Sequence, residues 1–398
     1  MTPHMALTES QRAEAGLIDA ARRLAPAARA ASDEAERMRQ TPPPLADAIT
    51  RAGIYQMYLP RAMGGPEASP LTAFEVIETL SRADGSVGWC AMIATSQSLN
   101  VSRLPVAIGR EMAGTPADFR AAGSARPGGR ARRVPGGYRV SGQWNFASGV
   151  RNARWLSCTS FLMDGAAPRR EPDGSPVLRS IWVPREEATV LDTWAVMGMR
   201  GTGSHDFVVE DVFVPDERTC SPDAPGEIDA PLYDKRAWYV HMWVTTAANA
   251  LGIARGAIED FLRIAETEAT TMSPNKLRDR PMVQARVAEA EAIVCGARAF
   301  LLDAVGRIWS QLCAGDRPSD ADIARGRLAI VHGMHEAVRA VDKIFHAAGT
   351  NAVYTRLPLE RAFRDVHVAV QHAAALPGYY ESAGKVLLGL RPSDTGWG

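Results

Sequence analysis

The chain has 398 residues, which is long enough to bury a large core and to form two or three domains. Its 45 basic and 45 acidic side chains balance, so no overall charge attracts it to nucleic acid or to an anionic membrane surface. No apolar run approaches the roughly twenty residues of a membrane span, and the first ten residues lack the basic and apolar regions of a signal peptide. We therefore expect a cytoplasmic protein whose partners are small molecules, not nucleic acid or membranes.

Residues 1–120 predict an N-terminal helical domain. Apolar residues recur near helical spacing from Glu9 onward, and the run Pro42-Pro43-Pro44 interrupts them. We expect further helices at 71–82, before Asp84-Gly85, and at 89–99, where the sequence is apolar enough for a buried helix.

Residues 121–225 change to glycine, proline, β-branched and aromatic residues, which predicts a central β-barrel-like domain. Its expected strands cover residues 138–146, 154–162, 179–184 and 206–214. Residues 164–176 are rich in proline, arginine and Asp-Gly, so we expect an exposed hairpin tip there.

The stretch from Gly136 to Gly149 is the centre of the prediction. Apolar residues and glycine occupy the even positions from Tyr138 to Phe146 and polar residues the odd ones, which is the pattern of a half-buried strand. Ala147-Ser148-Gly149 then ends the strand with small residues, so a flat ligand can approach the backbone beside a hydroxyl. The alternative is that Trp144 and Phe146 are core residues and Ser148 is a turn residue.

The glycine-rich segment from Gly198 to Ser204 is followed by β-branched residues and a proline. A phosphate-cradling loop should instead open a helix, so we reject that interpretation. Ser204-His205-Asp206 is not a catalytic triad either, because adjacent strand residues point to opposite faces.

Residues 226–398 predict a C-terminal helical bundle. His332 and His335 share one helical face, as in half a metal site, but no second ligand cluster completes it, so we expect no metal. The five cysteines are widely spaced and contain no Cys-x-x-Cys pair, which argues against a disulfide framework and a zinc site. The expected helices cover residues 238–268, 281–314, 320–347, 358–375 and 379–389.

The stretch from Phe363 to His372 contains Arg-Asp and two histidines. On a helix, His367 lies about 140° around the axis from His372, so both rings cannot easily face one pocket. We expect His372 to face the site, with His367 as a supporting group, and Asp365 to pair with Arg361 one turn back. A buried histidine satisfied by a carbonyl is the alternative for His372.

These motifs resemble the acyl-CoA dehydrogenase superfamily, and in particular its oxygen-using branch, the group D two-component flavin monooxygenases. The similarity covers residues 10–390. It implies an α+β fold like that of the acyl-CoA dehydrogenases, with the three domains above, and a homotetramer built by the helical bundle. It rests on Leu59–Gly65, Ala83–Trp89, Trp144–Gly149, Gly198–Pro215 and the Arg-Asp stretch before His372.

The resemblance implies the oxygenase component of a two-component system. Reduced flavin, FMNH2 or FADH2, arrives from a separate NAD(P)H:flavin reductase and reacts with O2 to give a C4a-hydroperoxide, which hydroxylates an aromatic or heteroaromatic small molecule. In related dehydrogenases a glutamate base follows the Arg-Asp pair by eight residues, but Ala373 stands there and cannot take a proton. His372 resembles the histidine that group D enzymes point at flavin and substrate, and it titrates near neutrality, so it can accept and return a phenol proton.

The same resemblance assigns the remaining site residues. Ser148, with His372 the second catalytic residue, would lie near flavin N5. Gln97 stands where relatives often have a histidine, and glutamine does not change charge at neutral pH, so an indole, a polycyclic phenol or an aromatic acid is a more plausible substrate than a simple phenolate. The cofactor-binding residues would be Trp144, Phe146, Ser148, Arg200, Thr202, Gly203 and Ser204, and the substrate-binding residues Trp89, Gln97, Ser124 and His372.

Three alternatives stay open at this stage. One is a dehydrogenase or oxidase of the acyl-CoA dehydrogenase type with a non-standard base. The second is an N- or S-oxygenase of the same family, and the third is a flavin-fold scaffold without catalytic activity.

Overall fold

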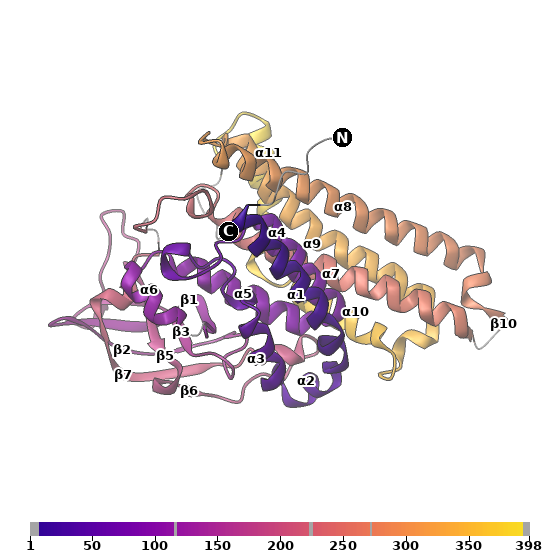
Figure 1. Ribbon diagram of the computed structural model, residues 1–398, viewed down its shortest axis with the longest axis horizontal. Helices are drawn as coiled ribbons and strands as arrows, with labels where there is room; N and C mark the ends of the chain where they lie inside the picture. The colour runs from indigo at the N-terminus through magenta and orange to yellow at the C-terminus, as the bar shows by residue number, and fades with distance from the viewer. Residues whose placement is uncertain (1–7, 115–117, 223–225, 271–272, 393–398) are drawn as a thin grey trace.

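The computed structural model describes residues 8–114, 118–222, 226–270 and 273–392. Helices precede and follow one large sheet, which confirms the predicted mixture of helical and β segments (Figure 1). None of the helices in these ranges combines the length and apolarity needed to cross a bilayer.

The N-terminal helices pack against the helices of the C-terminal segment and share one apolar core with them (Figure 1). Pro43 begins a helix at its first position, where a missing N–H costs nothing. Asp84 does more than end the preceding helix, because its carboxylate accepts a hydrogen bond from the Val87 N–H and caps the next one. The helices are α1 (Glu9–Ala30), α2 (Ser32–Met38), α3 (Pro43–Arg51), α4 (Pro70–Ala83), α5 (Gly85–Val101) and α6 (Val106–Ala113).

The central sheet has the strand order β6-β7-β2-β1-β3-β5-β8, with β4 paired to β3. Neighbouring strands are antiparallel except β1 and β3. The predicted strands are confirmed, with shifts of at most two residues at their ends. The strands are β1 (Ala121–Val134), β2 (Gly137–Trp144), β3 (Trp155–Asp164), β4 (Ala167–Pro168), β5 (Leu178–Pro184), β6 (Thr189–Val190), β7 (Phe207–Pro215) and β8 (Thr219–Cys220).

The longest strand, β1, was not predicted. Its buried and exposed residues do not alternate regularly, and it contains Pro127 inside an irregular stretch between Ser124 and Gly129, where the register against β3 shifts. Proline is tolerated in a sheet at such a point because no ladder hydrogen bond is lost there. The strand therefore lacks the pattern by which a half-buried strand is recognised.

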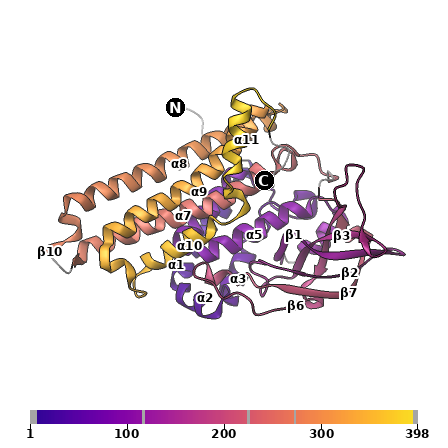
Figure 2. The same ribbon diagram turned by 180° about the vertical axis from the view of Figure 1, so that it is seen from behind.

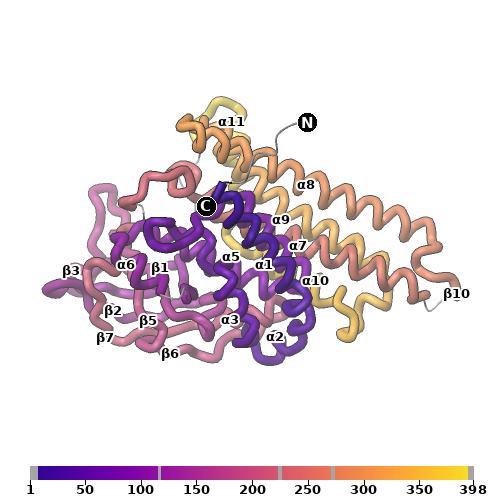
Figure 3. The backbone as a smooth tube through the Cα atoms, viewed as in Figure 1, coloured from indigo at the N-terminus to yellow at the C-terminus, as the bar shows by residue number. Residues whose placement is uncertain are grey.

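Three long helices lie side by side in the C-terminal segment, as both opposite views show (Figures 1 and 2). A short hairpin of β9 (Ala269–Thr270) and β10 (Ser273–Lys276) links the first two, at the end of the bundle far from the sheet (Figure 3). The helices are α7 (Trp238–Thr267), α8 (Pro281–Cys313), α9 (Asp320–Ala348), α10 (Pro358–Ala369) and α11 (Gly378–Leu387).

The prediction of one helix over 358–375 was wrong at its end. The helix α10 ends at Ala369, and His372 precedes a short 3-10 helix, η9 (Ala373–Ala375). The His372 ring itself caps η9, because its Nδ1 accepts a hydrogen bond from the Ala374 N–H at 3.2 Å. Residues 370–372 therefore form the turn that presents this histidine, and helical geometry does not relate it to His367.

Candidate active site

Two loops that the sequence singled out separately lie against each other. The N–H of Gly149 donates to the carbonyl of Thr202 at 2.8 Å, and the N–H of Ala147 donates to the carbonyl of His205 at 3.2 Å. The small residues that end β2 thus pack on the glycine-rich segment before β7. This pairing brings Ser148 and Ser204 together although 56 residues separate them.

Three buried hydroxyl groups form a continuous chain at this junction. Ser148 Oγ lies 2.7 Å from Ser204 Oγ, and Ser204 Oγ lies 2.6 Å from Thr202 Oγ1. Thr202 Oγ1 donates to the carbonyl oxygen of Met199 at 2.8 Å. We call Ser148, Ser204 and Thr202 the hydroxyl chain.

The hydroxyl chain ends at two aromatic rings. Trp89 Nε1 donates to Ser148 Oγ at 3.0 Å. The same indole meets the His372 ring edge to face, with ring centroids 5.5 Å apart. Both residues are half-buried. The structure therefore brings Trp89, Ser148, Thr202, Ser204 and His372 into one cluster from α5, the β2 and β7 loops and the turn after α10.

The state of the His372 ring follows from its partner. Because Nδ1 accepts the Ala374 N–H, the neutral ring carries its proton on Nε2. Burial lowers the pKa of His372 to about 4, so the expectation that it titrates near neutrality was wrong. At neutral pH the ring offers an Nε2–H donor, and proton uptake at Nδ1 would break the hydrogen bond from Ala374.

His335 on α9 supports the turn that carries His372. Its Nε2 donates to the carbonyl oxygen of Ala375 at 3.0 Å, which fixes η9 to the bundle. The sequence presented His335 only as half of a metal site. In the described residues no group of three potential metal ligands comes together, and all five cysteines are free thiols.

Asp365 is a second supporting residue that sequence reasoning misplaced. It does not pair with Arg361, whose guanidinium contacts Asp33 and Glu36 instead. Asp365 is buried, and its carboxylate accepts the N–H of Met199, which has a left-handed backbone with φ of 54°. Burial raises the pKa of Asp365 to about 7. The residue that receives the end of the hydroxyl chain is thus held by α10.

Two glycines allow the 198–204 segment to fit between other elements. A Cβ on Gly198 would collide with the carbonyl oxygen of Arg364 on α10. Gly203 has φ of 52°, and a Cβ there would collide with the carbonyl oxygen of Arg39. Gly203 is therefore required for packing against the residue after α2, and no ligand is needed to explain it.

Trp144 was predicted to pack on the flavin, and the structure corrects this. Its ring is 1% exposed, stacks on Phe207 at 5.3 Å, and its Nε1 donates to the carbonyl of Thr159 at 2.7 Å. A Cβ on Gly129 would collide with this indole, so that glycine makes room for it in the sheet core. Trp144 has no free face for a ligand.

Phe146 does not continue the alternation of β2. Its backbone is left-handed, with φ of 59°, and the ring is 62% exposed and meets Trp194 edge to face at 6.1 Å. The predicted strand therefore ends at Trp144, and Phe146 presents an open aromatic face two residues from Ser148. Arg200 is exposed, and within the described residues the only hydrogen bond of its side chain is from Nε to the carbonyl of Val196.

The side-chain oxygens of Gln97 and Ser124 differ in whether they have a hydrogen-bond partner. Gln97, two turns after Trp89 on α5, is buried, and its Oε1 has no hydrogen-bond partner among the described residues. A buried acceptor without a partner costs about 1–3 kcal/mol, so a substrate N–H or O–H that reached Gln97 Oε1 would recover this free energy. Ser124 Oγ already accepts the N–H of Arg126 at 3.3 Å, and β1 packs against α5.

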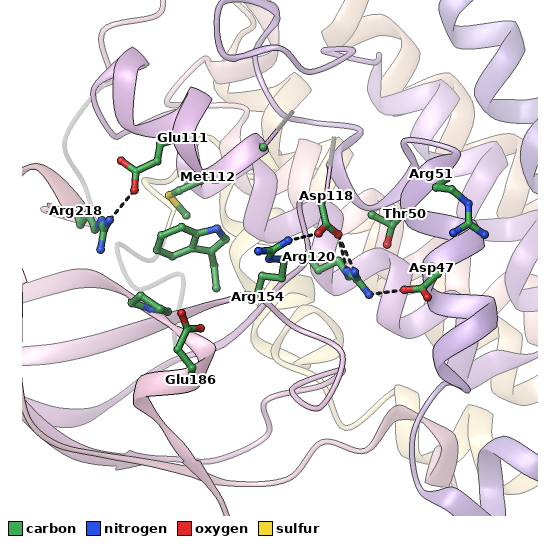
Figure 4. Close-up of a pocket in the computed structure, with 13 residues that line it drawn as sticks. Asp47, Thr50, Arg51, Glu111, Met112, Asp118, Arg120, Arg154, Glu186 and Arg218 are labelled. Atoms are coloured by element: carbon green, nitrogen blue, oxygen red, sulfur yellow. Dashed lines mark hydrogen bonds and ion pairs between the residues drawn. The ribbon is translucent and has the colours of Figure 1, made fainter. Parts of the chain in front are cut away.

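A cavity of about 760 Å³ lies elsewhere, between α3, α6 and the sheet (Figure 4). Its arginines are largely neutralised, since Arg120 pairs with Asp47 and Asp118, and Arg218 pairs with Glu111. None of the predicted site residues lines it. The cluster around Ser148, not this cavity, is the candidate active site.

The helical, β and helical segments with a site between them define an acyl-CoA dehydrogenase-like flavoprotein. The model of the acyl-CoA dehydrogenase N-terminal domain matches residues 11–104, and that of the C-terminal domain matches residues 244–377. The chain belongs to the flavin-dependent monooxygenases built on this fold, as its relatives make plain.

The chain is 33% identical to an indole-3-acetate monooxygenase of Pseudomonas putida, over 92% of this chain and 91% of the relative. It is 30% identical to the oxygenase subunit HsaA of a flavin-dependent monooxygenase from Rhodococcus jostii, over 94% and 98%. The crystal structure of 3-HSA hydroxylase from Rhodococcus sp. RHA1 superposes with a TM-score of 0.86 at 29% identity, covering 96% of this chain and 98% of that one. XiaF from Streptomyces, in complex with FADH2 and glycerol, gives a TM-score of 0.88 at 25% identity, covering 97% and 98%.

Proposed function

We propose that this chain is the oxygenase component of a two-component monooxygenase, which uses reduced flavin and O2 to hydroxylate an aromatic or heteroaromatic small molecule. The observation that carries the proposal is the cluster in which Trp89 joins Ser148 to His372. It combines a hydrogen-bonding group for a flavin ring with a neutral imidazole donor for a substrate. Relatives of similar length are named indole-3-acetate monooxygenase and FADH2-dependent resorcinol hydroxylase.

The residues present fit a flavin. Ser148 offers a hydroxyl oxygen, Phe146 an open aromatic face, and Arg200 guanidinium N–H groups without partners in the described residues. Together they can hold a flat ring system with a polar or phosphorylated tail, which suits both FMNH2 and FADH2. When bound, the flavin supplies the activation of O2, and the protein positions the substrate and excludes water.

On the substrate side we propose that His372 and Gln97 fix the orientation of the ring to be hydroxylated. His372 donates from Nε2, and Gln97 Oε1 accepts from an O–H or N–H of the substrate. The O–H of a neutral hydroxylated aromatic both donates and accepts, so it satisfies both groups, and an indole N–H satisfies Gln97. A phenolate would instead place an anion against the unpaired amide oxygen of Gln97. These two groups thus favour a substrate that brings its own hydrogen-bond donor.

The dehydrogenase alternative lacks its base. The position that would carry the catalytic glutamate is Ala373, the first residue of η9. Asp365, the carboxylate that most closely precedes Ala373, is buried and accepts the Met199 N–H, so it is engaged in the protein framework.

We also propose a homotetramer, a separate NAD(P)H:flavin reductase partner and a cytoplasmic location. The resemblance to the group D enzymes supports all three. Exposed apolar side chains at the C-terminal end, such as Leu387 and Leu388 of α11 and the turn after it, support association between copies. Light scattering coupled to size-exclusion chromatography tests the tetramer.

The test of function mixes the pure protein with a flavin reductase, NADH, FMN or FAD, and a panel of indoles, hydroxylated aromatics, amines and thioethers under 18O2. We expect a hydroxylated aromatic that carries one labelled oxygen, and no product without the reductase. His372→Ala should abolish most of this product, whereas His367→Ala, the matched control, should not. If NADH oxidation yields only hydrogen peroxide with every compound, the proposal is refuted. If the only labelled products are amine or sulfur oxides, the protein is an N- or S-oxygenase and not an aromatic hydroxylase.

A further inference from the structure

We infer that the carbonyl oxygen of Met199 sets the direction of the hydroxyl chain, so that Ser148 accepts a hydrogen bond from reduced flavin more readily than it donates one to oxidised flavin. The inference rests on the proposed function in one respect, namely that flavin N5 lies beside Ser148. It concerns how the protein distinguishes the two redox states of its cofactor.

The direction follows from counting hydrogens. A hydroxyl has one hydrogen to donate and can accept two, an indole N–H only donates, and a carbonyl only accepts. Thr202 gives its hydrogen to the carbonyl of Met199. Ser204 can then donate only to Thr202, and Ser148 only to Ser204, because each contact at 2.6–2.7 Å holds one hydrogen.

Only one lone pair of Ser148 Oγ remains free to form a hydrogen bond. Its own hydrogen is engaged by Ser204, and one of its lone pairs accepts the Trp89 N–H. The remaining lone pair can only accept. Reduced flavin carries a hydrogen on N5, whereas oxidised flavin presents a lone pair there, so the resting direction of the chain matches the reduced form.

Oxidised flavin requires the chain to reverse. Ser148 must then donate to N5, Ser204 to Ser148 and Thr202 to Ser204, and the bond from Thr202 to the carbonyl of Met199 is lost. That carbonyl keeps the Trp194 N–H at 3.0 Å, so reversal costs one hydrogen bond and leaves no orphaned group. One neutral hydrogen bond corresponds to a preference of about three- to tenfold for reduced flavin.

The arrangement suits an enzyme that takes reduced flavin from a partner and must release the oxidised product. A residue outside the hydroxyl chain fixes the direction of its hydrogen bonds. Asp365 on α10 accepts the Met199 N–H and holds Met199 in its left-handed conformation. Thr202, Ser204 and Met199 are thus positioning residues that act through Ser148.

The test measures the dissociation constants of oxidised FMN and, anaerobically, of FMNH2 by absorbance or fluorescence titration. Thr202→Val removes the anchored donor and frees the chain to reverse. We expect it to lower the ratio of the oxidised to the reduced dissociation constant about three- to tenfold, mainly by tighter binding of oxidised FMN. Ser204→Ala, which releases the Ser148 hydrogen directly, should do the same, and Thr202→Ser should restore the wild-type ratio.

Thr50→Val is the matched control, because Thr50 is a buried threonine whose hydroxyl donates to a helix carbonyl on α3, outside the site. It should leave the ratio unchanged. A ratio that stays the same, or moves toward reduced flavin, in both Thr202→Val and Ser204→Ala would overturn the inference while the proposed function stands. If the wild-type protein fails to bind either flavin and forms no product with a reductase, the proposed function itself fails.

Discussion

The indole of Trp89 connects the two catalytic candidates, because its N–H donates to Ser148 at 3.0 Å while its ring meets His372 at 5.5 Å. One side chain on α5 therefore sets the position of a group from the sheet and of a group from the C-terminal segment. The indole is half-buried, so it also contributes to the wall of the site. Mutation can test the contributions of the indole N–H and of the ring separately.

Trp89→Phe keeps a ring of related shape and removes the N–H. We expect the yield of hydroxylated product per NADH oxidised to fall about three- to tenfold, with a matching rise in hydrogen peroxide, because Ser148 loses one of its two fixed partners. Product and peroxide are measured in the same reductase-coupled assay. Trp309→Phe, which alters a half-buried tryptophan beside His241 in the bundle, is the control and should leave the yield unchanged.

His372 should act as a neutral donor. Because burial lowers its pKa to about 4, the ring stays uncharged from pH 6 to 9, and the rate of hydroxylation should show no ionisation of this residue in that range. Activity should fall toward pH 4, where proton uptake at Nδ1 breaks the bond from Ala374. His372→Ala should lower the rate about ten- to a hundredfold, and His372→Gln, which keeps an N–H donor, less. A pH profile with a midpoint between 6 and 7 that disappears in His372→Gln would contradict this assignment.

Gln97→Leu should stabilise the protein and weaken substrate binding. It removes a buried oxygen that has no partner in the described residues, so we expect the free energy of unfolding to rise by about 1 kcal/mol. The KM for substrates with an O–H or N–H donor should rise several-fold, as measured by steady-state kinetics beside urea unfolding. Gln56→Leu is the matched control, since Gln56 is also buried with an unpaired Oε1 but lies in the 3-10 helix 54–56. Equal effects of both variants on KM would show that Gln97 does not touch the substrate.

Asp365 should make the stability of the protein depend on pH. Burial, with Asp84 adding to it, raises the pKa of Asp365 from 3.8 to about 7 in the folded state. Between these pH values the folded protein binds the extra proton, so this residue's contribution to stability is fully present below pH 4 and is lost as the pH rises through 7. The size of the loss is on the order of a few kcal/mol.

Asp365→Asn removes the titration and keeps an oxygen for the Met199 N–H. The difference between its free energy of unfolding and that of the wild type should therefore increase in favour of the variant from pH 4 to 8, as urea unfolding at several pH values will show. Asp365→Ala leaves that N–H unpaired and should destabilise by about 1–3 kcal/mol at pH 4, and this deficit should shrink as the pH rises because the variant also lacks the titrating carboxyl group. A pH-independent difference between the wild type and Asp365→Asn would contradict the raised pKa.

Local patterns in the sequence predicted much of the fold. The long amphipathic helices α7 to α9 and the alternating strands β2 and β7 have strong periods, and the structure places them within a few residues of expectation. The strand β1 lacked a period because of Pro127 and its arginines. The end of α10 carries no proline or glycine signal, since the turn is made by the His372 ring and by His335 from another helix.

The site could be predicted only as separate parts. Ser148, Ser204 and Trp89 were recognised from motifs, but their hydrogen bonds connect residues 56 and 59 positions apart. Trp144 shows the limit of periodicity, because alternation identifies which face a side chain shares and not whether that face meets a ligand or the core. The bond between Asp365 and Met199 spans 166 positions and has no local signature.

The collisions that a side chain would make at Gly198 and Gly203 bear on how this protein can be recombined with its relatives. Backbone from the residue after α2, from the segment before β7 and from α10 meets at these two points. If a chimaera takes only one of these three segments from a homologue, that segment must pack against neighbours with a different sequence. Grafts intended to change the range of compounds oxidised should therefore exchange residues 36–41, 196–205 and 361–375 as one unit.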